Sequence, residues 1–95
     1  MAAYLIVRVD VTDWERYQEY MAGSPGVVAK YGGRFVVRGG EKVTLEGPED
    51  PNRLVVLEFG SLDQVKAFYY SPEYQELKRL REGAATASFV GVEGV

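Results

Sequence analysis

Cysteine and histidine are both missing from this chain of 95 residues, which also holds only two methionines and one tryptophan. Without cysteine there are no disulfides and no thiolate nucleophiles, and without either residue the usual ligands of zinc, haem and iron–sulfur clusters are absent. The commonest acid–base group near neutral pH is missing as well. Any chemistry must therefore use Asp, Glu, Tyr, Arg, Lys, Ser or Thr, and we expect neither a metal nor another cofactor.

A surplus of positive charge is also lacking. Asp and Glu outnumber Lys and Arg, 14 to 11, which gives a formal net charge of −3. Nucleic acid and anionic membrane surfaces attract Lys and Arg, so both are disfavoured as partners. The N-terminal apolar run MAAYLIVRVD is short and is interrupted by Arg8, so we expect neither a signal peptide nor a membrane span. The cytoplasm is the default location.

The first third of the chain predicts a strand followed by a helix. Residues 3–11 alternate between an apolar side and a mixed side, which is the period of a strand. Thr12 and Glu15 then match a capping box, which predicts a helix start. The helix is expected to continue to Tyr31, and its Ser-Pro-Gly segment at residues 24–26 predicts either a kink or a restart.

The middle of the chain predicts a hairpin. Arg34–Arg38 begins its first strand, the glycine pair at residues 39–40 suggests a bulge, and the strand is expected to resume through Val43 and Leu45. A turn segment rich in glycine, proline and acids follows. Residues 53–59 then form the second strand of the hairpin.

The last third predicts two short helices and a final strand. Ser61 and Gln64 match a second capping box, the Ser-Pro pair at residues 71–72 restarts the helix, and residues 86–93 form the last strand. The order is therefore βαββαβ, which right-handed crossovers convert into a four-stranded antiparallel sheet with helices on one face. We predict an α+β, ferredoxin-like fold in a single domain over residues 1–95.

One face of this sheet has no helix to cover it. By parity it carries Tyr4, Ile6 and Arg8 of the first strand, Val36 of the second, and Leu54, Val56 and Glu58 of the third. A face open to water would be mostly polar, whereas this one is half apolar. We therefore expect a homodimer in which two sheets pack face to face. A monomer that tolerates scattered surface aliphatics is the alternative.

Arg34, Arg38 and Glu58 are the first candidate site residues. Residues four apart on a strand share a face, about 13 Å apart, so both arginines are expected to point the same way. They could clamp a carboxylate, an enolate or a phenolate, but pairing with Glu58 or with an acid of a partner subunit is somewhat better supported. Glu58 has apolar strand neighbours, and a desolvated glutamate is a candidate general base.

The chain's seven tyrosines supply further candidates. A phenol can donate to a developing oxyanion, and its ring can stack on an aromatic ligand. Tyr17, Tyr31 and Tyr74 are the candidates to line a pocket, and Arg81 could bind an anion beside Tyr74. The structural alternative is that the rings fill the layer between helices and sheet, and that Arg81 caps helix carbonyls or forms an ion pair.

Several segments together resemble a known family. In order they are AYLIVRVDVTD, WERYQEY, YGGRFVVRGG, LEG, RLVVLEF, YYSPEYQELKRLR and VGVEG. Over nearly the whole chain they are similar to the domain-of-unknown-function family 1330, of the dimeric α/β-barrel superfamily. The departures are Gly60 and Phe68, where relatives often have Pro and Trp. The resemblance implies ferredoxin-like subunits and a homodimer. The superfamily includes cofactor-free monooxygenases, muconolactone isomerases and haem enzymes, and the lack of histidine argues against a haem role.

Two functions remain open at this point. In the first, a small anionic or enolisable molecule is bound or transformed without metal, in a pocket lined by Tyr17, Tyr31, Arg34, Arg38 and Glu58. In the second, the protein is a non-catalytic dimeric module with a structural or regulatory role, and the same arginines form ion pairs in the interface.

Overall fold

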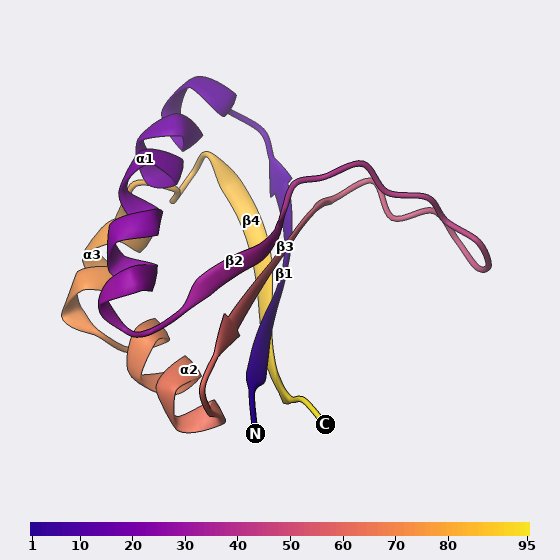
Figure 1. The fold of residues 1–95 in the computed structure, drawn as a ribbon. Helices are drawn as coiled ribbons and strands as arrows, with labels where there is room; N and C mark the ends of the chain where they lie inside the picture. The colour runs from indigo at the N-terminus through magenta and orange to yellow at the C-terminus, as the bar shows by residue number, and fades with distance from the viewer.

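The computed structural model describes all 95 residues as a four-stranded antiparallel sheet with helices on one face (Figure 1). The elements follow in the order β1 (Ala3–Val11), α1 (Trp14–Lys30), β2 (Arg34–Arg38), β3 (Arg53–Phe59), α2 (Leu62–Tyr69), α3 (Pro72–Arg79) and β4 (Ala85–Glu93). The strands lie side by side in the order β2-β3-β1-β4. The predicted ferredoxin-like fold is confirmed. None of the helices has the length and apolar composition that a membrane crossing requires.

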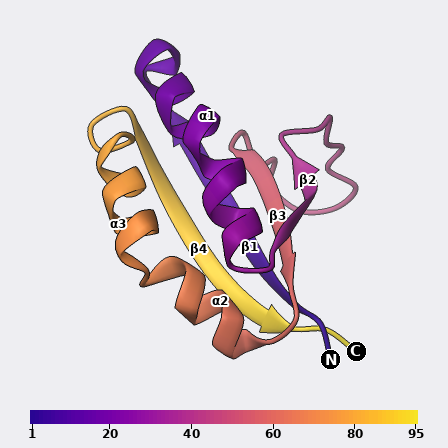
Figure 2. The ribbon, with the colours of Figure 1, turned by 60° about the vertical axis from the view of Figure 1, so that its left-hand side comes forward.

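The core lies between the sheet and the helices. Alternate residues of the central strands, such as Leu5 and Val7 of β1 and Leu57 of β3, are buried against the helices. Figure 2 shows α1 and the α2–α3 pair crossing the same face of the sheet, with α2 and α3 beside β4. Phe68 and Tyr74, among the largest fully buried side chains, come from that pair. Aromatic rings therefore fill much of the layer.

The start of α1 differs from the prediction. The Asp13 carboxylate accepts a hydrogen bond from the backbone N–H of Arg16 at 3.1 Å, so Asp13 is the N-cap. The hydroxyl of Thr12 instead donates to the carbonyl of Ala84, because this residue still pairs with the segment that leads into β4. The prediction that Thr12 and Glu15 form a capping box is therefore wrong.

The serine caps of the later helices are confirmed. The Ser61 hydroxyl accepts a bond from the N–H of Gln64, and the Ser71 hydroxyl accepts one from the N–H of Tyr74. Pro72 occupies the first turn of α3, where a missing N–H costs nothing.

Helix α1 continues through Pro25, so the predicted restart does not occur. Proline has no N–H to bond the carbonyl four residues earlier, which here belongs to Met21. The Arg38 guanidinium of β2 donates to that carbonyl at 2.8 Å, and the Ser24 hydroxyl donates to it at 3.3 Å. A side chain of the sheet thus replaces the helix bond that the proline removes.

A bulge in β2 decides where its arginines point. The register between β2 and β3 shifts between Phe35 and Val37, so Val36 is an extra residue in the strand. One extra residue exchanges the faces of everything that follows it. The bulge was expected at the glycine pair of residues 39–40, and that prediction is wrong.

As a result Arg34 and Arg38 lie on opposite faces of the sheet. Arg34 is opposite Glu58 on the open face, whereas Arg38 is opposite Val55, whose side chain is buried under the helices. The expectation that both arginines share a face is therefore wrong. The same shift places Val37, rather than Val36, in line with the open-face residues of β3.

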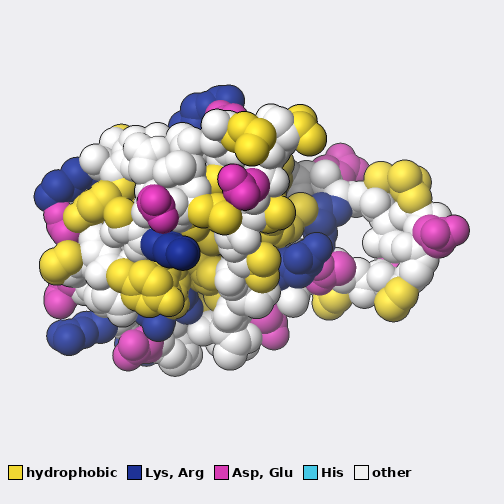
Figure 3. All heavy atoms as spheres, turned by 90° about the horizontal axis from the view of Figure 1, so that it is seen from below, with side chains coloured by type: hydrophobic (Ala, Val, Ile, Leu, Met, Phe, Trp, Pro, Cys, Tyr) yellow, Lys and Arg dark blue, Asp and Glu magenta, His cyan; other side chains and the backbone are white.

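Between β2 and β3 the chain forms a long arm, residues 40–52, instead of the expected continuation of the strand. It projects beyond the open face, away from the helices (Figure 1), and it stands clear of the body with apolar and acidic side chains (Figure 3). Val43 and Leu45 are 77% and 88% exposed. Arg8 of β1 binds the Asp50 carboxylate and so joins the arm to the sheet, and Lys42 donates to the Asp50 carbonyl across the base of the arm.

The open face otherwise has the predicted composition. In the pairing of β1 with β3, Tyr4 is opposite Glu58, and Ile6 is opposite Val56. On the edge strand β4, Val90 and Val92 are 58% and 48% exposed. The face therefore combines partly exposed aliphatic side chains with a few charges at its margins.

Candidate ligand-binding groove

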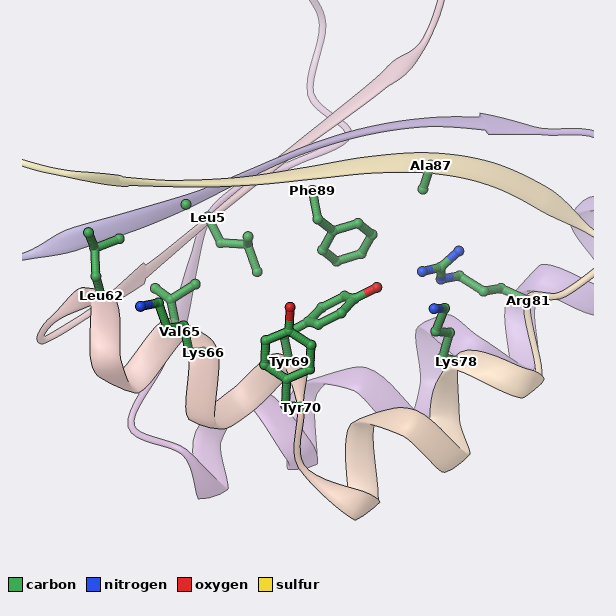
Figure 4. A pocket seen from close by; sticks show the side chains of 11 residues that line it. Leu5, Leu62, Val65, Lys66, Tyr69, Tyr70, Lys78, Arg81, Ala87 and Phe89 are labelled. Atoms are coloured by element: carbon green, nitrogen blue, oxygen red, sulfur yellow. The ribbon is translucent and has the colours of Figure 1, made fainter.

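A groove of about 520 Å³ lies between the α2–α3 pair and the sheet (Figure 4). The two helices are separated at Ser71, whose hydroxyl donates to the carbonyl of Phe68 and caps α3. The floor on β4 is low, since Ala87 and Gly91 are small residues on the side that faces the helices. The volume is in the range of small-molecule sites.

The lining of the groove is apolar with three cations. Leu5, Leu62, Val65, Tyr69, Tyr70, Ala87, Phe89 and Gly91 line it together with Lys66, Lys78 and Arg81. No acidic residue lines it, although acids outnumber bases in the chain. The groove is therefore electropositive within an acidic protein.

Arg81 is the buried charge of this groove. The residue is only 7% exposed, its Nε has no hydrogen-bond partner, and it belongs to none of the ion pairs in the structure. Its Cζ lies 5.1 Å from the ring centre of Phe89 and 5.7 Å from that of Tyr20. The neighbouring Tyr74 hydroxyl and the aromatic faces compensate only part of the cost of burying a cation. An anion in the groove would supply the missing partner.

Tyrosines surround the guanidinium. The hydroxyl of Tyr69 points toward the Arg81 end of the groove, and Tyr70 stands at the front of it (Figure 4). The Tyr69 ring packs 5.4 Å from Phe89 and 5.2 Å from Tyr74. A planar ligand would therefore meet aromatic surface beside the cation.

Tyr74 lies behind the groove and is fully buried. Its hydroxyl shares a hydrogen bond of 2.8 Å with the hydroxyl of Tyr20. Burial raises the pKa of both tyrosines, because a phenolate would be poorly solvated there. Both phenols remain neutral near neutral pH, so Tyr74 supports the wall of the groove and is not placed to exchange a proton with a ligand.

Tyr17 lies on the far side of Phe89, in a separate cavity of about 30 Å³ that has room for roughly one water. The residue is 4% exposed and its ring stacks on Tyr20. Arg38 and Arg53 also line this cavity. Burial raises the pKa of Tyr17, and the nearby arginines oppose that shift without cancelling it.

Tyr31 lies where the end of α1 meets the start of α3, and the pair of Arg34 and Glu58 lies on the open face of the sheet. The Tyr31 hydroxyl donates to Glu73 at 2.8 Å, and the Lys30 ammonium also binds this carboxylate. These bonds hold the pKa of Glu73 down, at about 2, and they join the end of α1 to the start of α3.

On the open face, the Nε of Arg34 donates to Glu58 at 2.6 Å. The hydroxyl of Tyr4 donates to the other carboxylate oxygen at 3.2 Å. Glu58 is therefore paired within its own chain. It faces away from the helices and from the groove.

Of the residues that the sequence suggested for a site, only Arg81 lines the groove, and Tyr74 supports it from behind. Tyr17, Tyr31, Arg34, Arg38 and Glu58 do not form one pocket, because the bulge in β2 and the end of α1 send them to different faces. Lys66, Lys78 and Phe89 also line the groove and were not among the predicted site residues. The spacing of Tyr74, Lys78 and Arg81 was an available signal, since residues three and four apart share a helical face.

The comparisons with known proteins agree with this fold. A family model described as a domain of unknown function (DUF1330) matches residues 2–95. The chain belongs to the DUF1330 family. The resemblance inferred from the sequence is thereby confirmed. A search of curated proteins finds no match.

Solved structures similar to this DUF1330 protein include a protein of unknown function from Rhodopseudomonas palustris, with 20% identity, a TM-score of 0.77, and coverage of 99% of this chain and 82% of that one. A dimeric ferredoxin-like protein of unknown function from Jannaschia sp. CCS1 has 16% identity, a TM-score of 0.71, and coverage of 99% and 100%. SnoaB, a cofactor-independent oxygenase from Streptomyces nogalater, has 14% identity, a TM-score of 0.67, and coverage of 99% and 93%. At these identities the likeness concerns the fold.

Proposed function

We propose that this DUF1330 protein binds a small, flat, organic anion in the groove between α2, α3 and β4, with Arg81 as the anchor. The observation that carries the proposal is the buried guanidinium of Arg81, which faces an apolar groove and has no acid to pair with. A carboxylate, phenolate or enolate would complete the ion pair. The flanking rings of Tyr69 and Phe89 favour an aromatic or conjugated body.

The same arrangement suits an enolisable ligand. A desolvated cation stabilises negative charge that develops beside it, because little water is present to screen the interaction. The proposed binding needs no metal, since the positive charge comes from Arg81 and Lys78.

Isothermal titration of 2-naphthoate into the protein tests the proposal. Charge-assisted hydrogen bonds to a buried cation contribute roughly 1.5–3 kcal/mol, so Arg81→Gln should raise the Kd about 30-fold. The matched control is Arg79→Gln, the last residue of α3 and two positions before Arg81, whose side chain is 72% exposed and which should leave the Kd unchanged. Equal binding by the wild type and Arg81→Gln would contradict the proposal.

Because Arg81 is buried, its replacement could also lower stability. Two further measurements keep the proposal testable in that case. Lys78→Gln, at a more exposed position of the same groove, should weaken 2-naphthoate several-fold. The neutral analogue 2-naphthalenemethanol should bind the wild type more weakly than 2-naphthoate does. Equal affinity for the alcohol and the acid would show that the negative charge of the ligand does not contribute to binding.

We also propose that the protein works as a homodimer through its open sheet face. Ile6, Val56, Val90 and Val92 present apolar surface there, and the arm of residues 40–52 extends past the same face with Val43 and Leu45 exposed. A second copy packed on the open face would cover both features. Sedimentation velocity at micromolar concentration should give the mass of two chains, and a single-chain mass would contradict this part.

The alternative function, a dimeric module without a ligand, also depends on the open face. The pairing of Arg34 with Glu58 favours it, because those side chains satisfy each other at the proposed interface. That function predicts no binding of either naphthalene probe and an unchanged dimer mass.

A further inference from the structure

The cations of the groove lie at its two ends, which bears on the kind of anion that fits. Lys78 and Arg81 come from the α3 end, together with the hydroxyl of Tyr69, whereas Lys66 comes from α2 beside Leu62 and Val65 (Figure 4). Neither lysine takes part in an ion pair within the chain. The two ends therefore offer separate positive charges that the protein itself does not neutralise.

The surface between the two ends is apolar. Leu5, Val65 and Phe89 line it, and Gly91, which pairs with Leu5 in the sheet, lies on the floor. A Cβ atom added at Gly91 would be 3.2 Å from the Cγ1 of Val65 and 3.4 Å from the Cδ2 of Leu62. The side chains of α2 therefore pack directly on the floor of the groove at Gly91. The absence of a side chain at Gly91 is what permits this close packing.

We infer that the ligand of this groove carries an anionic group at each end of a flat apolar body, as an aromatic or conjugated dicarboxylate does. One carboxylate pairs with Arg81 and Lys78, and the other reaches Lys66 at the α2 end. This inference rests on the proposed function, since it takes Arg81 as the anchor. It adds that the ligand carries a second anionic group and lies along the groove from Arg81 to Lys66.

Matched monoacids and diacids test it. The probes are benzoate against terephthalate, and the longer 2-naphthoate against naphthalene-2,6-dicarboxylate, each measured by isothermal titration. The better-fitting diacid should bind the wild type about fivefold more tightly than its monoacid, which is the gain expected from one partly exposed ion pair. Phthalate, whose carboxylates are adjacent, should show no such gain.

Substitutions test whether Lys66 provides the additional affinity of the diacid. Lys66→Gln should remove the advantage of the diacid and leave the monoacid Kd unchanged, because only the second carboxylate reaches that end. Arg79→Gln is the control and should change neither.

The outcomes separate the inference from the proposal on which it rests. If monoacid and diacid bind the wild type equally in both pairs, the ligand has one anionic end and the inference is overturned, while the anchor at Arg81 stands. If the diacid keeps its advantage in Lys66→Gln, the second charge is bound elsewhere and the inference is also overturned. If none of the four probes binds, both the inference and the proposed function fall.

Discussion

The two faces of the sheet treat their charged residues differently. On the open face, Arg34 pairs with Glu58, and Arg8 pairs with Asp50 at the base of the arm. On the face that the helices cover, Arg81 has no acidic partner, and Arg38 donates to a carbonyl. An uncompensated buried charge is costly, so an anion that pairs with Arg81 would be stabilising, whereas Arg34 and Arg8 already have acidic partners. The comparison therefore favours the proposals of ligand binding on the helix side and of self-association on the open side.

The largest expected effect comes from placing a charge on the open face. Val56→Asp would bury an unpaired carboxylate from each chain in the proposed dimer, at a cost of several kcal/mol. The dimer dissociation constant should rise more than about 1000-fold, seen as a single-chain mass in sedimentation. Gln18→Asp adds the same charge on the exposed surface of α1 and should leave the dimer intact. A Val56→Asp protein that still sediments as two chains would place the interface elsewhere.

The next effect concerns the hydrogen bond from Arg38 of β2 to the Met21 carbonyl of α1. Arg38→Met removes the donor to the Met21 carbonyl and should lower the free energy of unfolding by about 1 kcal/mol. In a Pro25→Ala background the helix regains its own N–H donor at that carbonyl. The cost of Arg38→Met should therefore be smaller there, and chemical denaturation of the four proteins measures the coupling. Equal costs in both backgrounds would show that Arg38 stabilises the protein in another way.

These two regions also show what the sequence could and could not predict. Alternation in residues 3–11 and 53–59, and the serines at positions 61 and 71, were sufficient for the fold and for most of the open face. The bulge at Val36 was not predictable, because no glycine or proline marks it and its register depends on the pairing with β3. That single residue moved Arg38 to the other face of the sheet.

The candidate site was less predictable than the fold, and the reason lies in which side chains remain unpaired. Nothing in the sequence distinguishes Arg81, which no acid accompanies, from Arg34, which Glu58 neutralises. Pairing depends on contacts between distant segments. The low floor formed by Ala87 and Gly91 likewise has meaning only once β4 lies under α2 and α3.

A third prediction concerns pH and the link between α1 and α3. The pKa of Glu73 is lowered from 4.5 to about 2, first by the hydrogen bond from Lys30 and then by that from Tyr31. A depressed carboxyl pKa stabilises the fold above pH 4.5, and this contribution is lost as the pH falls toward 2. The stability difference between the wild type and Glu73→Gln should therefore shrink over that window, measured by urea unfolding.

Glu76→Gln, on the same helix, is the control for this series and should keep the pH dependence of the wild type. Solvent screening at the exposed Glu73 keeps the expected difference small. A stability difference between the wild type and Glu73→Gln that is constant from pH 6 to pH 2 would show that the link does not depend on the carboxylate charge.

The smallest expected effect is a direct check on the comparison of the two faces. Arg34→Gln should leave the Kd of 2-naphthoate unchanged, because Arg34 lies on the open face with its own acid partner. Titration under the conditions used for Arg81→Gln measures it. A loss of binding in Arg34→Gln would mean that the ligand lies on the open face, and the division of roles between the faces would be wrong.

The assignment of the groove rests on Arg81 more than on any other residue. A crystal structure of the protein grown with 2-naphthoate tests it most directly. We predict that the carboxylate lies within hydrogen-bond distance of the Arg81 guanidinium and that the rings lie along Phe89 and Tyr69. A structure in which the naphthoate carboxylate pairs with arginines of the open face, while the groove holds only water, would contradict the account.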